Sequence, residues 1–245
     1  MMQVIYNQTF NIRTSEVDAH TFAHPHALIR LMQEASMQHT LINRISFQDL
    51  TGLQATWILL KMDVRFMKFP KLNDIVTVQT YPSGIQGFFT FRDYLMTDSN
   101  GGLIASIASM WALMHTETRK IIRIPEHLDA MVHTGNTVLG KPDFTPEFQD
   151  YPCEPVFKKV NYLHLDWNGH VNNVQLLKML LACLDEAFVT QNKLIRLQVQ
   201  YKYEALIGME LKLCNHLAEN TIQHIITDTA TGKIIVIAQS AWVNR

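Results

Sequence analysis

The chain has 245 residues, of which 47% are hydrophobic and 18% are charged, and its formal net charge is −1. This balanced charge, without a run of Lys or Arg, argues against nucleic acid as the main partner. No apolar stretch reaches the roughly 18 residues needed to span a bilayer, and the opening residues lack the basic and apolar regions of a signal peptide.

The first half of the chain predicts one long helix followed by antiparallel strands. Helical spacing places a set of side chains on one face, namely Leu28, Leu31, Met32, Ala35, His39 and Ile42. Gly84, Gly87 and the SNGG of residues 99–102 indicate turns, and a strand on each side of SNGG indicates a hairpin. A linker over residues 135–155 is indicated by Pro142, Pro146, Pro152 and Pro155.

The second half predicts the same order of elements. The apolar face of its helix is expected to consist of Val174, Leu177, Leu180, Leu181, Leu184 and Phe188. The next strand alternates, and one of its sides is expected from Ile195, Leu197, Val199, Tyr201 and Tyr203. Thr231 and Gly232 indicate a turn between two later strands. One helix packed on an antiparallel sheet, twice over, is an α+β architecture.

Comparison of the two halves shows an internal duplication. The matching blocks are residues 16–32 with 164–180, residues 64–78 with 199–213, and residues 96–111 with 226–242. In the first block Asp18 falls over Asp166, and the apolar positions that follow keep the same phase. We therefore predict an N-terminal unit over residues 1–134, the linker, and a C-terminal unit over residues 156–245.

Four stretches of the sequence carry a resemblance to a known family: MQEAS, TWILLKMDVRFMKFPKLNDIV, FRDYLMTDSNGGLIASIASMW and LDWNGHVNN. They resemble stretches of bacterial and plant acyl-ACP thioesterases (ACP, acyl carrier protein), and the likeness runs from about Val4 to Val243. Its strongest element is the signature Asp-x-Asn-x-His-Val-Asn-Asn. The resemblance implies two fused hot-dog folds, each a long helix wrapped by an antiparallel sheet. It also implies an acyl-ACP hydrolase of fatty acid biosynthesis that uses no cofactor.

The stretch LDWNGHVNN, residues 165–173, concentrates polar side chains ahead of the second predicted helix. One interpretation is structural, because Asn172 or Asn173 is a good N-cap and Asp166 and Asn168 are common turn formers. The other interpretation is a reaction site. The duplication helps to choose, because Asp18 repeats Asp166 and shows that the aspartate alone can serve the turn in both units.

The remaining polar residues are not repeated. Asn168 falls over His20, His170 over Phe22, and Glu204 over Phe69. If the cluster only started a helix, the first copy should resemble it more closely. This asymmetry favours one active site per chain.

Thioester hydrolysis is the chemistry that such a set favours. A helix N-terminus offers N–H groups for a developing oxyanion, and His170 is a residue type suited to proton transfer near neutral pH. Asn168 would hold water or substrate, and Asp166 would orient its neighbours. Strand alternation alone would make Glu204 a solvated residue beside Lys202. The resemblance instead places an active-site carboxylate at Glu204 and assigns Asp166, Asn168 and His170 to the site.

Two further expectations follow from the resemblance. Plant members typically have a cysteine directly after the glutamate, whereas this chain has Ala205, which favours water attack assisted by Glu204. The acyl chain is expected in a hydrophobic tunnel of the N-terminal unit, although core packing is an alternative for each candidate. The candidates are Met32, Met37, Trp57, Leu59, Met62, Phe66 and Trp111.

The expected partner is an acidic acyl carrier protein, which a local basic patch would attract. The available cations are Lys158, Lys159, Lys178, Arg196 and Lys202. Cys153, Cys183 and Cys214 are widely spaced without a CxxC motif, so neither a disulfide framework nor a metal site is expected. We expect a cytoplasmic protein, with a homodimer left open. The alternatives are an acyl-CoA thioesterase of the same fold, a non-catalytic acyl-binding sensor and, less favoured, a hydratase.

Overall fold

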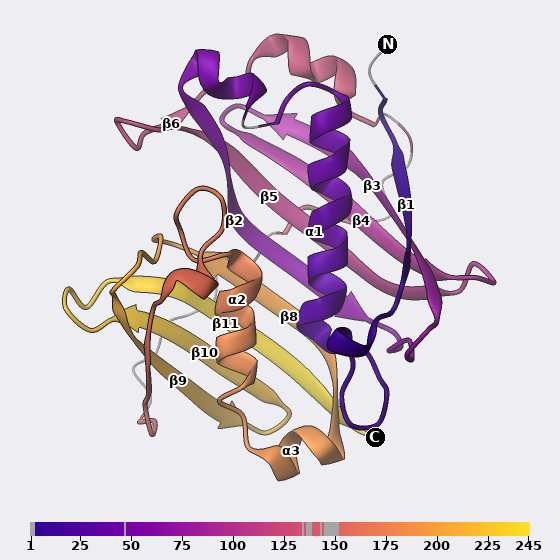
Figure 1. Ribbon diagram of the computed structural model, residues 1–245, viewed down its shortest axis with the longest axis vertical. Helices are drawn as coiled ribbons and strands as arrows, with labels where there is room; N and C mark the ends of the chain where they lie inside the picture. The colour runs from indigo at the N-terminus through magenta and orange to yellow at the C-terminus, as the bar shows by residue number, and fades with distance from the viewer. Residues whose placement is uncertain (1–2, 47, 134, 136–138, 143, 145–151) are drawn as a thin grey trace. The chain divides into compact units, whose positions relative to one another are not determined.

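The computed structural model describes residues 3–46, 48–133, 135, 139–142, 144 and 152–245. The chain divides into two compact units, Met1–Asp143 and Phe144–Arg245. Much of the predicted linker, including Pro146, lies outside the described residues. Each unit carries helix on one face of an antiparallel sheet, so the predicted α+β class with two hot-dog folds is confirmed (Figure 1).

The first unit consists of one long helix and a sheet with strand order β1-β3-β4-β5-β2, in which β6 pairs with β5. Every pair of neighbouring strands is antiparallel. The elements are β1 (Tyr6–Asn11), η1 (Thr14–Glu16), α1 (Pro25–Ile42), η2 (Asp49–Leu53), β2 (Ala55–Phe66), β3 (Ile75–Gln86), β4 (Phe89–Asp98), β5 (Leu103–His115), β6 (Ile121–Ile122) and η3 (Glu126–Met131).

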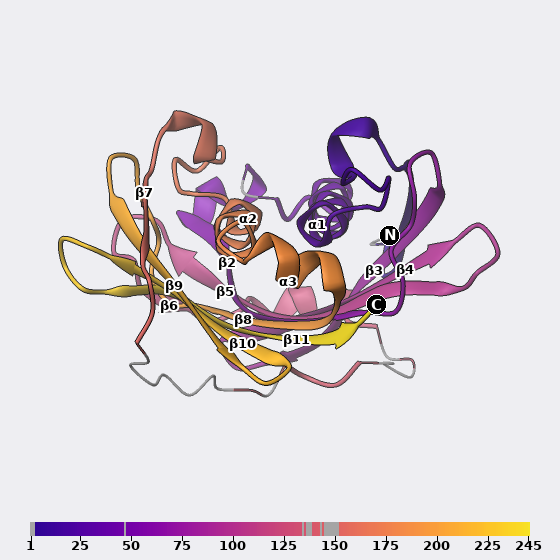
Figure 2. The same ribbon diagram turned by 90° about the horizontal axis from the view of Figure 1, so that it is seen from below.

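The second unit has the strand order β8-β11-β10-β9-β7, again antiparallel throughout. The elements are β7 (Val156–Lys159), η4 (Tyr162–His164), α2 (Asn173–Leu181), α3 (Glu186–Gln191), β8 (Asn192–Tyr201), β9 (Glu210–Ala218), β10 (Thr221–Asp228) and β11 (Ile234–Asn244). Seen end-on, α1 lies on one face of the first unit's sheet, and α2 and α3 lie on one face of the second unit's sheet (Figure 2).

Backbone hydrogen bonds reproduce the duplication residue by residue. Asp18 N–H donates to Phe22 O over 2.8 Å, and Asp166 N–H donates to His170 O over the same 2.8 Å. In the next pair of equivalent bonds, Ala23 N–H donates to Pro70 O and Val171 N–H donates to Ala205 O. The register inferred from the sequence blocks is therefore the register of the fold.

Helix α1 buries the face that its spacing predicts, with one exception. Leu28, Leu31, Met32, Ala35 and His39 are buried, whereas Ile42 is 53% exposed. Ile42 is the last residue of the helix, and the chain turns away directly after it. Pro25 occupies the first turn of α1, where a missing N–H costs nothing.

The prediction of a single long helix in the second unit is wrong. Helix α2 ends at Leu181, and α3 begins after Asp185, whose carboxylate accepts a hydrogen bond from Phe188 N–H over 2.9 Å. An aspartate that caps a new helix offers the backbone an alternative to continuing the old one. Leu184 and Phe188 are consequently only half-buried, and the ring of Phe188 meets that of Trp242 edge-on.

A polar group lies buried under α2 in the second unit. Trp242 Nε1–H donates to Ser240 Oγ over 2.7 Å. The Ser240 hydroxyl donates to His224 Nε2, also over 2.7 Å, because the ring carries its proton on Nδ1. His224 Nδ1–H then donates to Asn215 Oδ1 over 2.8 Å. The order serine, histidine, amide resembles a nucleophile and its base, but Ser240 and His224 are both buried, so no substrate meets them. We interpret the group as a structural network.

This network predicts acid sensitivity. Burial lowers the pKa of His224 to about 3, whereas an unfolded chain protonates histidine near pH 6.5. Because unfolding then takes up a proton, the free energy of unfolding should fall as pH drops below about 6.5, at about 1.4 kcal/mol per pH unit. His39, with a pKa lowered to about 4 by burial and then by the charge of Arg92, adds to this loss.

Urea unfolding of wild type and His224→Gln between pH 7 and 4.5 measures the effect. The variant should be less stable at pH 7 and lose stability less steeply on acidification. The exposed His127→Gln is the matched control and should keep the wild-type slope. Equal slopes for wild type and His224→Gln would contradict the assignment.

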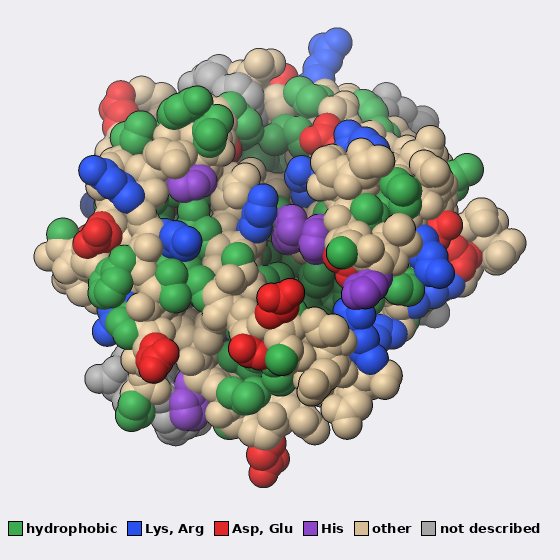
Figure 3. Space-filling model, turned by 60° about the horizontal axis from the view of Figure 1, so that its bottom comes forward, with side chains coloured by type: hydrophobic (Ala, Val, Ile, Leu, Met, Phe, Trp, Pro, Cys, Tyr) green, Lys and Arg blue, Asp and Glu red, His purple; other side chains and the backbone are tan. Residues whose placement is uncertain are grey.

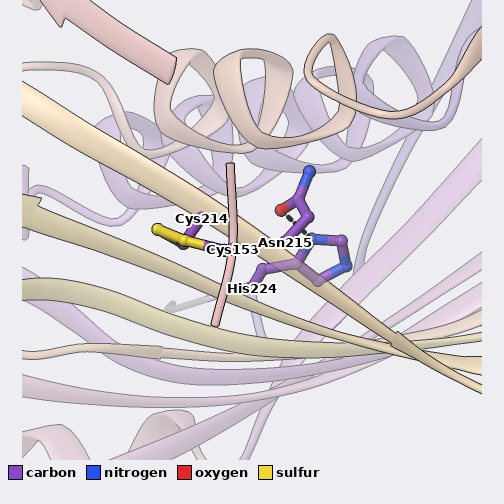
Figure 4. Close-up of a disulfide and its surroundings, with 4 residues drawn as sticks. All are labelled: Cys153, Cys214, Asn215 and His224. Atoms are coloured by element: carbon purple, nitrogen blue, oxygen red, sulfur yellow. Dashed lines mark hydrogen bonds between the residues drawn. A yellow bond between two sulfur atoms is a disulfide. The ribbon is translucent and has the colours of Figure 1, made fainter. Parts of the chain in front are cut away.

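A disulfide joins Cys153 to Cys214 in the second unit, with 5.7 Å between the two Cα atoms (Figure 4). The expectation of no disulfide is therefore wrong for this pair. Strand β7 pairs with β9, with Val156 opposite Leu213, and this pairing brings the two cysteines together. Their separation of 61 residues gave no sign of it.

Two further features bear on partners. Among the described residues, no helix combines the length and the apolar character required to cross a bilayer. On the face drawn in Figure 3, Lys and Arg side chains lie among hydrophobic and acidic ones and form no continuous stripe.

Candidate active site

The loop before α2 is shaped by Asp166. Its Oδ1 accepts hydrogen bonds from Asn168 N–H over 2.8 Å and from His170 N–H over 3.4 Å. Gly169 follows with φ of 76°, a left-handed conformation that glycine adopts without strain. Asp18 makes the same bonds in the first unit, to His20 N–H and Phe22 N–H. Asp166 therefore orients the loop, and the carboxylate serves the turn in both copies.

The structure brings His170 and Glu204 together. His170 Nε2 lies 3.5 Å from Glu204 Oε2, and the two side chains are 25% and 37% exposed. Backbone pairing sets this contact, because His170 forms a β-bridge with Leu206 and Val171 N–H donates to Ala205 O. An imidazole and a carboxylate that touch each other and solvent are suited to moving a proton.

Glu204 does not belong to the alternating strand assumed from the sequence. Strand β8 ends at Tyr201, and the N–H groups of Lys202 and Tyr203 both donate to Ile235 O. The chain then turns, so alternation says nothing about the direction of the Glu204 side chain. This irregular segment is what carries the carboxylate to His170.

The first copy lacks this pair at the equivalent positions. Phe22 takes the place of His170 and forms a β-bridge with Lys71, the counterpart of Leu206. Phe69 takes the place of Glu204 and stacks on Phe66, with 5.3 Å between the ring centroids. The same backbone thus holds an apolar pair in one unit and an acid–base pair in the other.

The N-terminus of α2 is capped by Asn172, as one of the two predicted residues. Its Oδ1 accepts from Val174 N–H over 2.8 Å, and its carbonyl accepts from Gln175 N–H and Leu176 N–H. These bonds reduce the number of helix N–H groups available to a substrate oxyanion. Asn168, the remaining predicted site residue, is exposed, and its backbone N–H is held by Asp166.

The candidates for the acyl tunnel all belong to α1, β2 or β5 of the first unit. Register places Leu59 opposite Trp111 and Met62 opposite Ser109, so these side chains share one face of the sheet. Met32, Met62 and Phe66 are buried, whereas Met37, Trp57, Leu59 and Trp111 are half-buried. Trp57 packs against a separate apolar cluster and donates from Nε1 to Ile45 O.

Sequence reasoning missed a polar network inside the first unit. The guanidinium of Arg92 is buried and donates to Thr80 Oγ1 over 3.1 Å and to His39 Nδ1 over 3.0 Å. His39 then donates from Nε2 to Gln3 O over 2.6 Å. Burial lowers the pKa of Arg92. Nothing in the sequence placed Arg92 beside His39.

Other groups considered in the sequence are not arranged to act as nucleophiles or metal ligands. Ala205 is buried, and Cys183 directs its thiol to Met179 O over 3.1 Å. Burial raises the pKa of the Cys183 thiol, which disfavours a thiolate nucleophile. Within the described ranges, no three His, Cys, Asp or Glu side chains gather closely enough to hold a metal ion.

The repeated aspartates give a matched test. We expect Asp166→Ala to lower kcat/KM roughly tenfold or more, because His170 loses its orientation. Asp18→Ala removes the same turn from the first copy and should leave kcat/KM close to wild type. Both should lower the free energy of unfolding by about 1 kcal/mol. Thioester turnover and urea unfolding check this, and equal losses of activity in both variants would contradict it.

Comparisons with known proteins agree with the fold and identify the family. Residues 3–132 match the family model of the acyl-ACP thioesterase N-terminal domain, and residues 155–244 match that of the C-terminal domain. The chain is 25% identical over 271 residues to a chloroplastic palmitoyl-acyl carrier protein thioesterase of Arabidopsis thaliana, covering 99% of this chain and 65% of the relative. A chloroplastic palmitoyl-acyl carrier protein thioesterase of Cuphea hookeriana is 24% identical, covering 82% of this chain and 52% of the relative. The chain thus spans about half to two thirds of the length of these curated relatives.

Solved structures show the same fold. The 12:0-ACP thioesterase of Umbellularia californica superposes with a TM-score of 0.89 at 18% identity, covering 100% of this chain and 99% of that one. An acyl-ACP thioesterase of Bacteroides thetaiotaomicron gives 0.86 at 20% identity, covering 98% of both chains. With both family models matched in order along its length, the chain belongs to the acyl-ACP thioesterase family.

Proposed function

We propose that this chain hydrolyses fatty acyl-ACP to free fatty acid and holo-ACP. The observation that carries the proposal is the His170–Glu204 pair, 3.5 Å apart and present in the second copy alone. The chain belongs to the acyl-ACP thioesterase family, and this membership supports thioester hydrolysis as the reaction class. The relatives named as acyl-ACP hydrolases support the same substrate.

In the proposed mechanism, Glu204 accepts a proton from water as the water oxygen attacks the thioester carbonyl carbon. A C–O bond forms, the C–S bond breaks, and His170 donates a proton to the leaving sulfur. Asn168 holds the water or the thioester, and Asp166 keeps the loop in place through its two backbone contacts. Water attack needs no thiol, which agrees with a buried Ala205 directly after Glu204.

We assign the acyl chain to the interior of the first unit. Met32, Met62 and Phe66 supply buried apolar surface there. Apolar surface of this kind binds fatty acyl groups through hydrophobic contact, without hydrogen bonds that would select one acyl group over another. We also place the enzyme in the cytoplasm, in fatty acid biosynthesis, and subcellular fractionation tests the compartment, since the plant relatives are named as chloroplastic.

Thiol release from acyl-ACPs of graded chain length tests the function, with the same acyl groups on coenzyme A measured in parallel. We expect saturable release of holo-ACP, with a higher kcat/KM for acyl-ACP than for acyl-CoA. A higher kcat/KM for acyl-CoA would contradict acyl-ACP as the donor and identify acyl-CoA in its place. Acyl binding without thiol release from either donor would refute hydrolysis and favour a sensor.

A further inference from the structure

Four large apolar side chains stand exposed on the two segments that frame the candidate site. Tyr162 and Leu163, in η4, are 73% and 67% exposed, and Leu206 and Ile207, directly after Ala205, are 41% and 60% exposed. We call these four residues the apolar rim. Large exposed side chains gathered at one place on a protein mark interaction sites more often than isolated ones do.

Backbone hydrogen bonds join the two segments of the apolar rim to each other and to the site. Val160 N–H donates to Met209 O over 2.8 Å, and Gly208 N–H donates to Val160 O over 3.0 Å. Leu206 forms its β-bridge with His170, so the apolar rim borders the His170–Glu204 pair. Whatever covers the apolar rim therefore lies next to the reacting groups.

The fold itself does not require Tyr162, Leu163 or Leu206 to be apolar, because the first copy builds the same backbone with polar residues at these three positions. There Ile12 N–H donates to Asp74 O and Asn73 N–H donates to Ile12 O, which are the counterparts of the bonds at Val160. Counting from these bonds, Thr14 and Ser15 replace Tyr162 and Leu163, and Lys71 replaces Leu206. Leu72, which is half-buried, replaces Ile207. The copy with the acid–base pair thus exposes four large apolar side chains, whereas the first copy keeps a single, half-buried one at these positions.

Cations lie beside the apolar rim. Lys158 and Lys159, in β7, lead into η4 and are exposed, and Lys202 is exposed two residues before Glu204. Lys233 lies over the ring of Tyr203, with 5.1 Å between Nζ and the ring centroid. An apolar centre with cations around it complements an acidic protein surface with apolar contacts of its own.

Resting on the proposed function, we propose that the apolar rim and its flanking lysines form the docking surface for an acidic acyl carrier protein. Its phosphopantetheine arm carries the thioester to Glu204 and His170. A small free thioester has to bind only the reacting groups and the acyl site, and gains nothing from Tyr162 or Leu163. Of the cations available to the carrier, the proposed surface uses Lys158, Lys159 and Lys202.

The test uses Tyr162→Thr/Leu163→Ser, which installs the two residues that the first copy tolerates at the same backbone positions. We expect kcat/KM for acyl-ACP to fall roughly tenfold, mainly through KM. Turnover of the same acyl group on pantetheine should change less than twofold. Leu217→Ser, on β9, is the matched control for losing an exposed apolar side chain and should alter neither substrate.

A second variant, Lys158→Gln/Lys159→Gln, should raise KM for acyl-ACP at low salt and weaken its dependence on NaCl. Direct binding of holo-ACP to wild type and to both variants gives a readout independent of hydrolysis. Equal loss on acyl-ACP and acyl-pantetheine, or unchanged carrier affinity in the Tyr162→Thr/Leu163→Ser variant, overturns the docking surface. If wild type hydrolyses no thioester, the proposed function fails, and carrier binding still decides this inference.

Discussion

Replacing Glu204 by glutamine is expected to lower kcat for acyl-ACP by about 10²-fold or more, the size of a general base's contribution. Glutamine keeps the shape and the hydrogen bonding of the side chain but accepts no proton from water. Because Glu204 is partly exposed and β8 has already ended, the fold should tolerate the change. KM should change little, since the lost interaction belongs to the transition state.

His170→Ala should cause a loss of similar size, and the double variant should lose little more than either single one. Such non-additivity is expected of two groups that act as a unit. Steady-state thiol release with urea unfolding of each variant measures this, and Phe69→Leu, at the counterpart of Glu204, is the control. A role of Glu204 in orienting water alone would leave Glu204→Gln with substantial turnover. A near wild-type kcat in folded Glu204→Gln and His170→Ala would contradict the assignment of both residues as acid–base groups.

Reducing the Cys153–Cys214 bond is expected to lower the free energy of unfolding by about 4 kcal/mol, from the chain-entropy treatment of a loop of this length. The bond closes a loop over a sequence separation of 61 residues. That loop contains the whole candidate site, from Asp166 to Glu204. Opening it frees the unfolded chain while β7 keeps its pairing to β9, so the native site should persist.

Urea unfolding of wild type with and without dithiothreitol measures the difference. Thiol titration of the denatured protein should find one free thiol before reduction and three after it, because the chain has three cysteines. Cys153→Ser should be as stable as the reduced wild type, and Cys183→Ser is the matched control and should keep the redox response. Identical urea midpoints for the bonded and the reduced protein would contradict the prediction. In a reducing cytoplasm the pair would be held as thiols.

The fold could be predicted largely because its signals are local or repeated. The 3.6-residue spacing from Leu28 to His39 identifies α1, and the matching blocks around Asp18 and Asp166 identify the duplication. The cap at Asn172 also follows from residues next to it. The break between α2 and α3 was missed because Asp185 interrupts an apolar pattern that would suit one long helix.

The candidate site was predictable in part. The loop carrying Asp166, Asn168 and His170 is contiguous in the chain, and its difference from the first copy singles it out. Glu204 was named from the resemblance, while strand alternation predicted its exposure but not its contact with His170. The buried Arg92–His39 contact and the His224 network had no signal in spacing, because each joins residues from different strands or from a helix and a strand.

The sequence by itself determined that two related units, each of a helix and an antiparallel sheet, make up the chain, and that only the second has the asparagine–histidine pair. Tertiary structure decided that His170 meets Glu204, that Cys153 meets Cys214, and that Tyr162 and Ile207 border the same site. The physical reason is the range of the forces involved. Side-chain spacing and capping act over a few residues and leave a pattern in the chain. Strand pairing joins distant residues through backbone hydrogen bonds, which form with almost any side chain. Contacts between such residues therefore leave no local pattern in the sequence and are seen only in the tertiary structure.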